Sequence, residues 1–167
     1  MEIWDLYDIQ GNKTGETLVR GDKVPEGRYH LVVHVWIKNS EGKYLVSQRS
    51  ADRHNFPLLW ECVGGSVVRG EDSLTGALRE CEEEIGVSLE PSHGRIVFSR
   101  ARDVINGKRY GDIMDVWLFE YNGIADLKKA TTYEVADVRW ATVEEIRELW
   151  DRGEFVPTLG YFFDEIA

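Results

Sequence analysis

The chain has 167 residues, of which 43% are hydrophobic, and it carries a formal net charge of −10. The length predicts one domain, residues 1–167, with a sizeable core, and the apolar fraction excludes a disordered chain. The negative charge excludes a nucleic-acid backbone as the main partner, because its phosphates would be repelled, but it permits a small phosphorylated substrate bridged by metal ions.

The cysteine content and the N-terminal residues point to the cytoplasm. Only Cys62 and Cys81 are present, which does not suggest the disulfide framework of a secreted protein. The first residues lack the basic and apolar regions of a signal peptide, and no apolar run approaches the roughly 20 residues that cross a bilayer. We therefore expect a cytoplasmic protein with no membrane partner, and we leave a homodimer open.

Strands and helices are mixed along the whole chain. The expected strands cover residues 4–20, as a small hairpin within an N-terminal extension 1–28, and then residues 28–38, 44–48, 96–104, 110–121 and 137–140. The expected helices are an acidic one that Gly86 ends, one at 143–150 and a terminal one at 157–166. This order predicts an α/β fold in which helices cover both faces of a sheet, an α/β/α sandwich.

Turn signals separate these elements. Gln10-Gly11-Asn12 and the region of Gly15 are expected to turn within the hairpin. Asn39 to Gly42 and Asn106-Gly107 are expected to join strands, and residues 52–59 form a loop that contains Pro57.

The acidic helix has two distinct faces. Its apolar residues recur at helical spacing and form one stripe: Leu74, Ala77, Leu78, Cys81 and Ile85. The carboxylates of Glu80, Glu83 and Glu84 gather on another face, where like charges one turn apart cost a few tenths of a kcal/mol per pair. A solvated acidic face is the simpler interpretation. The alternative is a site for a hard divalent cation, because carboxylate oxygens suit Mg²⁺ or Mn²⁺.

The segment from Gly65 to Val87 favours the cation site. It carries glycines, acidic residues and an arginine at fixed spacing, namely Gly65, Glu71, Arg79, Glu80, Glu83, Glu84, Gly86 and Val87. This pattern resembles the signature of the Nudix hydrolases, the Nudix box. Cys81 stands at a position that is aliphatic in the signature, and a buried cysteine behaves as a small hydrophobic residue. The resemblance implies a Nudix α/β/α sandwich with a mixed β-sheet.

The resemblance also implies roles for individual residues. The metal ligands would be the carbonyl of Gly64 and the carboxylates of Glu80, Glu83 and Glu84, with Glu83 or Glu80 also acting as the general base. Glu71 and Arg79 would support the helix. The implied cofactor is Mg²⁺ or Mn²⁺, and the implied reaction is hydrolysis of the pyrophosphate linkage in a nucleoside diphosphate joined to another group X.

A further metal carboxylate is expected from a later part of the chain. Glu120, at the end of an apolar strand, resembles the extra ligand of the branch that cleaves nucleoside triphosphates. A strand-end residue facing water is the alternative interpretation. Asp115, on the opposite face of the same strand, and Glu134 are the other candidates.

Other side chains are weaker candidates. His30 and His34 share a strand face but stand roughly 13 Å apart, so they cannot bind one metal ion together, and a core or edge position is the better prediction for each. Three tryptophans could stack a nucleobase but are more often core residues: Trp36, Trp60 and Trp117. Four arginines could contact phosphate, although their spacing singles none of them out: Arg49, Arg100, Arg102 and Arg109.

Three segments outside the box, residues 4–22, 30–50 and 134–146, resemble the branch related to isopentenyl-diphosphate isomerase. His30 lies at the position of a metal histidine of that branch. The isomerase cysteine and turn histidine are replaced by Gly64 and Ser66, and Cys62 lies two residues too early. One isomerase strand carboxylate falls at Ile113, while Asp115 retains the other. The residues therefore favour hydrolysis. Isomerisation is the first alternative, and a non-catalytic nucleotide-binding domain is the second.

Overall fold

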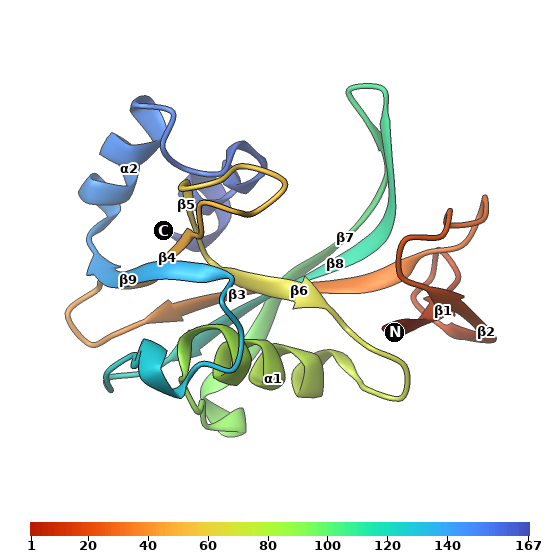
Figure 1. Ribbon diagram of the computed structural model, residues 1–167, viewed down its shortest axis with the longest axis horizontal. Coiled ribbons are helices and arrows are strands. Elements are labelled where there is room, and N and C mark those ends of the chain that lie inside the picture. The colour runs from red at the N-terminus through yellow and green to blue at the C-terminus, as the bar shows by residue number, and fades with distance from the viewer.

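A mixed β-sheet forms the centre of the protein, and helical segments lie on both of its faces (Figure 1). The computed structural model describes residues 1–167. Its strands are β1 (Ile3–Tyr7), β2 (Lys13–Val19), β3 (His30–Lys38), β4 (Tyr44–Arg49), β5 (Trp60–Glu61), β6 (Val63–Ser66), β7 (Gly94–Ile105), β8 (Lys108–Glu120) and β9 (Val135–Ala141). Its α-helices are α1 (Ser73–Ile85) and α2 (Val143–Asp151).

Strand β3 organises the sheet. It pairs in parallel with β8 along its whole length and antiparallel with β6, so that Val33 lies opposite Gly65 and His34 opposite Gly64. Strand β7 pairs antiparallel with β8, and β4 carries β5 and β9 as antiparallel partners. The turn between β7 and β8 falls at Asn106-Gly107, as predicted, and both residues have positive φ.

Alternate residues of β3 belong to two different cores. Val33, Val35 and Ile37 pack in one cluster with the buried residues of α1. Val32 and Trp36 pack in the other cluster with α2 and the C-terminal segment. Because successive side chains of a strand point to opposite faces, the sheet is covered on both sides. This confirms the predicted α/β/α sandwich.

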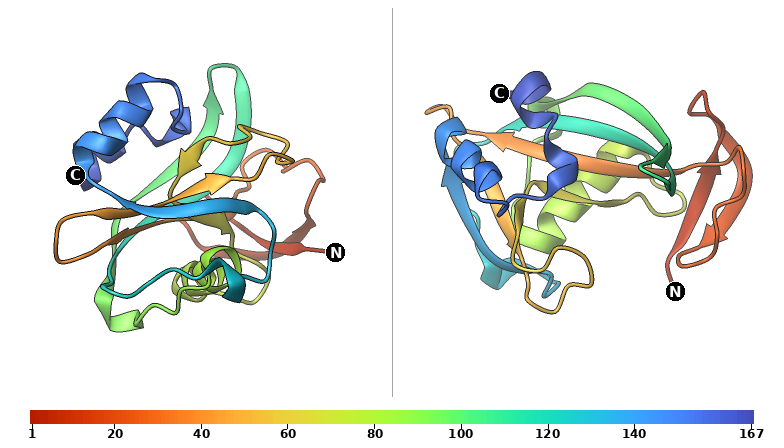
Figure 2. Two further views of the ribbon diagram at one scale, coloured as in Figure 1. Left: turned by 60° about the vertical axis from the view of Figure 1, so that its left-hand side comes forward. Right: turned by 90° about the horizontal axis from the view of Figure 1, so that it is seen from above.

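The N-terminal hairpin forms a separate two-stranded sheet at one end of the molecule (Figure 2). An isolated pairing of Tyr7 with Tyr29 connects it to the start of β3. The predicted turn at Gly11 is present, with a φ of 83°. Near Gly15 the structure has an irregularity within β2 in place of the predicted turn: the register shifts between the pairs Asp5–Thr17 and Tyr7–Lys13, and Gly15, which lies between them, has a positive φ.

The predicted terminal helix over 157–166 is also wrong. The segment forms a 3-10 turn, Pro157–Leu159, and then a π-helical turn, Phe162–Ile166. Gly160 lies between them against Trp150, where a Cβ would approach the indole Cη2 to 2.9 Å. The buried side chains of Leu159, Phe162 and Ile166 hold this irregular segment on the sheet, so tertiary packing outweighs helical periodicity.

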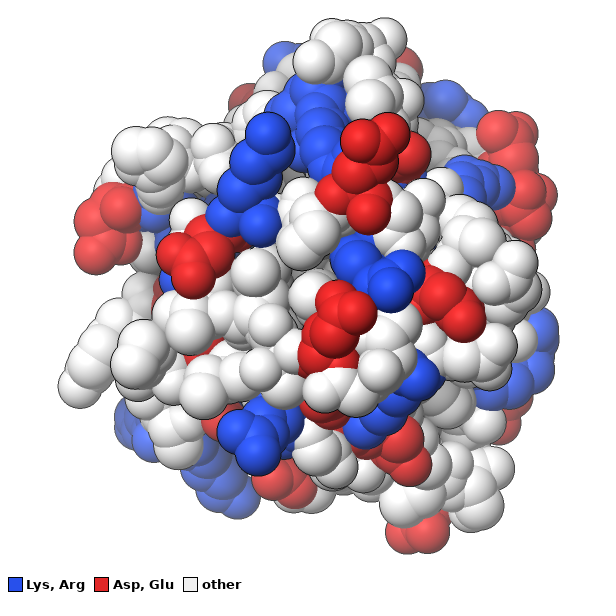
Figure 3. Space-filling view, turned by 90° about the vertical axis from the view of Figure 1, so that its right-hand side faces the viewer, with Lys and Arg blue, Asp and Glu red and all other residues white.

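The surface on the side of the N-terminal hairpin carries both signs of charge, interspersed without a broad basic area (Figure 3). This face therefore lacks the basic stripe that contacts nucleic-acid backbones. None of the helices combines the length and the apolar character required to span a bilayer.

Candidate active site

Helix α1 is held at both ends by its own sequence. The side chain of Asp72 accepts a hydrogen bond from Thr75 N at 2.8 Å, which caps the N-terminus. Gly86 adopts a left-handed conformation with φ of 65°, and its N–H donates to the carbonyls of Cys81 and Glu82. The prediction that Gly86 ends the helix is confirmed. The carboxylates of the last turn therefore have fixed positions.

Arg79 joins the helix to the preceding strand. Its guanidinium donates two hydrogen bonds to Glu71, at 2.8 and 2.9 Å, and one to the carbonyl of Ser66 at 3.0 Å. It also donates to Glu80 at 3.0 Å and to Glu83 at 3.1 Å. Burial raises the pKa of Glu71, but the hydrogen bonds from Arg79 outweigh it and leave the pKa lowered. Arg79 and Glu71 thus fix the position of α1 relative to β6.

Glu80 lies directly against the glycine turn. A Cβ at Gly65 would collide with both oxygens of the Glu80 carboxylate, so only glycine leaves room for this side chain. Burial raises the pKa of Glu80 to about 7, an effect that Arg79 opposes and that the charges of Glu83 and Glu134 reinforce.

Glu84 is the most enclosed of the three helix carboxylates, with an exposed fraction of 7%. Burial raises its pKa well above the ordinary value, and the charges of Glu80, Glu61 and Glu134 raise it further. The Glu134 side chain lies close enough to contribute to this shift. Glu84 is therefore not part of a solvated acidic face, and the simpler interpretation of this face is wrong.

Two arginines sit behind this carboxylate cluster, which we define as Glu61, Glu80, Glu84 and Glu134. Arg49 forms an ion pair with Glu61 at 2.9 Å, and Arg53 forms one with Glu134 at 2.8 Å. These arginines neutralise Glu61 and Glu134 at the edge of the cluster. Neither of them pairs with Glu80 or Glu84, which remain close together.

The donor set fits a hard divalent cation, although no three acidic, histidine or cysteine side chains have the geometry of a metal site in the structure. Glu80 and Glu83 each turn one oxygen to Arg79. The crowded carboxylates raise one another's pKa, and a cation between them would relieve that repulsion. The donors are all oxygens, which suits Mg²⁺ or Mn²⁺.

Glu83 differs from its neighbours in exposure. Its side chain is 37% exposed and borders a shallow polar hollow together with Lys129 and Thr131. Its backbone carbonyl accepts hydrogen bonds from the N–H groups of Thr131 and Thr132. Glu83 therefore reaches solvent while its backbone is fixed.

The later-strand candidates lie in three different places. Glu134 belongs to the carboxylate cluster. Glu120 is exposed at the end of β8, opposite Lys38, and borders a separate hollow with Leu89 and His93. Asp115 is buried and accepts a hydrogen bond from Ser99 at 2.6 Å. The structure brings only Glu134 to Glu80 and Glu84.

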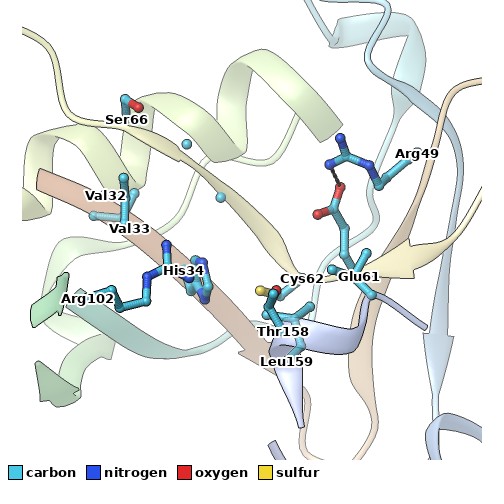
Figure 4. A pocket seen from close by; sticks show the side chains of 13 residues that line it. Val32, Val33, His34, Arg49, Glu61, Cys62, Ser66, Arg102, Thr158 and Leu159 are labelled. Atoms are coloured by element: carbon cyan, nitrogen blue, oxygen red, sulfur yellow. Dashed lines mark hydrogen bonds and ion pairs between the residues drawn. The ribbon is translucent and has the colours of Figure 1, made fainter. Parts of the chain in front are cut away.

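A cavity of about 200 Å³ opens beside the glycine turn (Figure 4). Gly64 and Gly65 line it on one side, and Glu61 connects it to the carboxylate cluster. His34 and Arg102 line the opposite side. Pockets for whole drug-sized ligands run to roughly 300–1,000 Å³, so this cavity fits one end of a ligand.

The two histidines of β3 have different surroundings. His30 is buried and stacks on Trp4 with ring centroids 4.0 Å apart, and its Nδ1 has no hydrogen-bond partner. The predicted core position is confirmed for His30. The carboxylate on its face is Asp112, whereas Asp115 lies on the opposite face of the sheet.

The tryptophans and arginines also separate by position. Trp36 and Trp117 are core residues, and Trp60 lies under the guanidinium of Arg139.

Of the four candidate arginines, only Arg49 and Arg102 line the cavity. Asp112 holds Arg102 through two bonds of 2.8 and 2.9 Å. The remaining two contact other groups: Arg100 lies over Phe98, and Arg109 bonds Asp103 and the Pro25 carbonyl.

Sequence reasoning missed Glu61 and Tyr161. Glu61 had a detectable signal, because it is an acidic residue in an otherwise apolar segment three residues before Gly64. Tyr161 had none, because it reaches the cavity region from the C-terminal segment only through tertiary packing.

The sequence is similar to known proteins over most of its length. Residues 28–159 match the NUDIX domain. A Nudix hydrolase of Listeria innocua is 37% identical over 98% of this chain and 91% of its own length. An isopentenyl-diphosphate Δ-isomerase of Nocardia farcinica is 28% identical over 86% of this chain and 81% of its own.

Solved structures share the fold. A crystal structure of a Deinococcus radiodurans protein has a TM-score of 0.69 and 24% identity, over 93% of this chain and 92% of its own. A bifunctional NMN adenylyltransferase/ADP-ribose pyrophosphatase of Francisella tularensis, complexed with AMP and a manganese ion, has a TM-score of 0.61 and 18% identity, over 89% and 44% of the two chains. With its intact box and a domain match over most of its length, this chain belongs to the Nudix family and is a Nudix hydrolase of the branch similar to isopentenyl-diphosphate isomerase.

Proposed function

We propose that the protein is a metal-dependent pyrophosphohydrolase that cleaves a nucleoside diphosphate joined to another group X. The observation that carries this proposal is the carboxylate cluster beside Gly65, in which burial and mutual repulsion raise the pKa values of Glu80 and Glu84. A pyrophosphate is anionic, and an acidic site binds it only through cations.

The metal would be held by this chain's own oxygens. We assign the Gly64 carbonyl and the carboxylates of Glu80, Glu83 and Glu84 as ligands. Glu134 joins them in place of Glu120, because Glu134 borders Glu84 whereas Glu120 lies at the far end of β8. Bound Mg²⁺ or Mn²⁺ would neutralise the phosphates and lower the pKa of a bound water.

Glu83 is the general base in this proposal. Its Oε2 is bonded to Arg79, while its Oε1 makes no hydrogen bond within the protein and can accept a proton from water. The water oxygen bonds to one phosphorus, and the bridging oxygen leaves with the other phosphate. Arg79 keeps the side chain oriented, and Glu71 in turn holds Arg79.

The cavity and a relative in fold support the proposed substrate class. A relative in fold carries AMP and manganese, which supports a nucleotide and a divalent cation as ligands here. The cavity beside Gly65 has room for one end of such a ligand, and Arg102, which lines it, is the proposed phosphate contact.

The test is a panel of nucleoside diphosphate derivatives, such as ADP-ribose and dinucleoside polyphosphates, assayed with Mg²⁺ and with Mn²⁺. Phosphate is measured after coupling to a phosphatase. We expect turnover of at least one derivative that stops when EDTA exceeds the metal. Full turnover in excess EDTA would exclude the metal assignment, and binding without turnover across the panel would favour a non-catalytic nucleotide-binding domain.

A further inference from the structure

His34, which lines the cavity, belongs to a hydrogen-bond network with Tyr161 and Trp36. Its Nδ1 lies 2.7 Å from the hydroxyl oxygen of Tyr161, and the indole N–H of Trp36 donates to the same oxygen at 3.0 Å. Trp36 is fully buried and Tyr161 is half-buried, so these hydrogen bonds are largely shielded from water.

The chain of bonds selects one tautomer of His34. An indole nitrogen can only donate, so Trp36 occupies one lone pair of the Tyr161 oxygen. The Tyr161 hydroxyl hydrogen has no acceptor in the protein other than His34 Nδ1. Leaving that hydrogen unpaired in a shielded position would be unfavourable. His34 therefore accepts at Nδ1 and carries its own hydrogen on Nε2.

The charge of the ring follows from its surroundings. Because Nδ1 accepts a hydrogen bond, the ring carries a single hydrogen and is neutral. Burial and, to a smaller extent, the positive charge of Arg102 also lower the pKa of His34. Burial also raises the pKa of Tyr161, so the phenol keeps its hydrogen. His34 is thus a neutral donor held in one tautomer.

The free N–H is directed at the cavity. The Cδ2 atom of His34, next to Nε2 in the ring, would lie 3.4 Å from a Cβ at Gly64. Nε2 has no partner in the protein, and it is not among the polar atoms that are enclosed without one. Figure 4 shows the ring between Arg102 and the glycine strand.

We infer that His34 is a ligand-binding residue, which donates a hydrogen bond from Nε2 to a phosphate oxygen of the bound diphosphate, and that Tyr161 is the positioning residue that fixes its tautomer. This inference rests on the proposed function, because it places the diphosphate between the carboxylate cluster and Arg102. Because the donor is uncharged, it would orient a phosphate oxygen without adding positive charge. In the proposed site the metal ions already neutralise the phosphates.

The tautomer can be measured without any substrate. Long-range ¹H–¹⁵N NMR of the imidazole nitrogens should show a protonated Nε2 and an unprotonated Nδ1 for His34 at pH 7. In Tyr161→Phe the Nδ1 acceptor loses its donor, and we expect a mixture of the two tautomers. A wild-type protein with a protonated Nδ1 would overturn the inference whatever the enzyme's activity.

Ligand binding is tested with methylenediphosphonate, a non-hydrolysable pyrophosphate analogue, in Mg²⁺ by calorimetry. His34→Leu removes the donor and should weaken binding about tenfold, while His34→Gln places an amide N–H near the Nε2 position and should recover most of the affinity. His93→Leu, an exposed histidine outside the cavity, is the matched control. Thermal unfolding checks that each variant is folded.

The outcomes separate the two proposals. Equal affinities of the wild type and His34→Leu would overturn the role of His34 and leave the proposed function standing. Failure of the wild type to bind the analogue at all would overturn the proposed function and the inference with it. Tenfold weaker binding in His34→Leu, with recovery in His34→Gln, supports both.

Discussion

Glu83 and Glu84 are adjacent in sequence, yet one side chain reaches solvent and the other is enclosed. Because Glu83 is more than a third exposed, Glu83→Gln should leave the folded protein as stable as the wild type. It removes the proposed base, so turnover should fall by about 10²–10⁴-fold. Steady-state kinetics and thermal unfolding check this prediction.

Glu82→Gln is the matched control for Glu83→Gln, since Glu82 is an exposed neighbour on the same helix. It should change neither rate nor stability. A loss of stability in Glu83→Gln comparable to that of a core truncation would instead give Glu83 a structural role.

The pKa of Glu80 makes stability depend on pH. Burial raises this pKa from an ordinary 4.5 to about 7, so between these values the folded state holds a proton that the unfolded state has lost. The free energy of unfolding must then fall as pH rises through this window, by at most about 3 kcal/mol from this group. Urea unfolding in EDTA at pH 4.5 and pH 8 measures the change.

Glu80→Gln provides the comparison, because other carboxylates titrate in both proteins. We expect the wild type to lose more stability than Glu80→Gln between pH 4.5 and pH 8. Saturating Mg²⁺ at pH 8 should restore stability to the wild type and much less to the variant. Parallel stability curves for the two proteins would contradict the burial of a proton on Glu80.

At the scale of elements, the close approach of β6 to α1 depends on Gly65. In Gly65→Ala the new Cβ would collide with the Glu80 carboxylate, which must then move out of the site. We expect a loss of about 1–3 kcal/mol in unfolding free energy and a fall in turnover. Denaturant unfolding and kinetics on the purified variant measure both.

A double-mutant cycle identifies the cause of that loss. Glu80→Asp shortens the acid by one methylene, so it should relieve the collision and recover part of the stability of Gly65→Ala. Additive effects of the two substitutions would show that Gly65 is required for another reason.

Elements with strong local signals could be predicted from the sequence. Helix α1 has a capping aspartate, an apolar stripe and a terminal glycine, and the β7–β8 turn has Asn106-Gly107. The C-terminal segment could not be predicted, because its turns follow from how Phe162 and Ile166 pack on the sheet.

The residues of the candidate site could likewise be predicted only where their signal is local. The box marks the carboxylates of α1, because their spacing is local. Choosing Glu134 over Glu120 required the fold, since Glu134 comes to Glu84 from a segment whose only link to α1 is tertiary contact. The roles of His34 and Tyr161 also depend on a contact between distant residues.

At the scale of the whole molecule, the enzyme should hydrolyse and not isomerise. Gly64 and Ser66 replace the isomerase cysteine and histidine, and Cys62 is buried with a thiol pKa raised well above its ordinary value by burial. No acid is then positioned to protonate an alkene. Incubation with isopentenyl diphosphate should yield no dimethylallyl diphosphate, and formation of that product at an enzymatic rate would favour the isomerase alternative.

The parallel pairing of β3 with β8 determines when the protein can become active during its synthesis. Residues 30–38 pair with residues 112–120, so this contact closes a loop that contains the whole box. Closing so long a loop is slow compared with forming the adjacent β7–β8 hairpin. A chain emerging from the ribosome therefore carries the carboxylates of α1 before β8 has docked, and the proposed metal site, which includes Glu134 from after β8, should be complete only later.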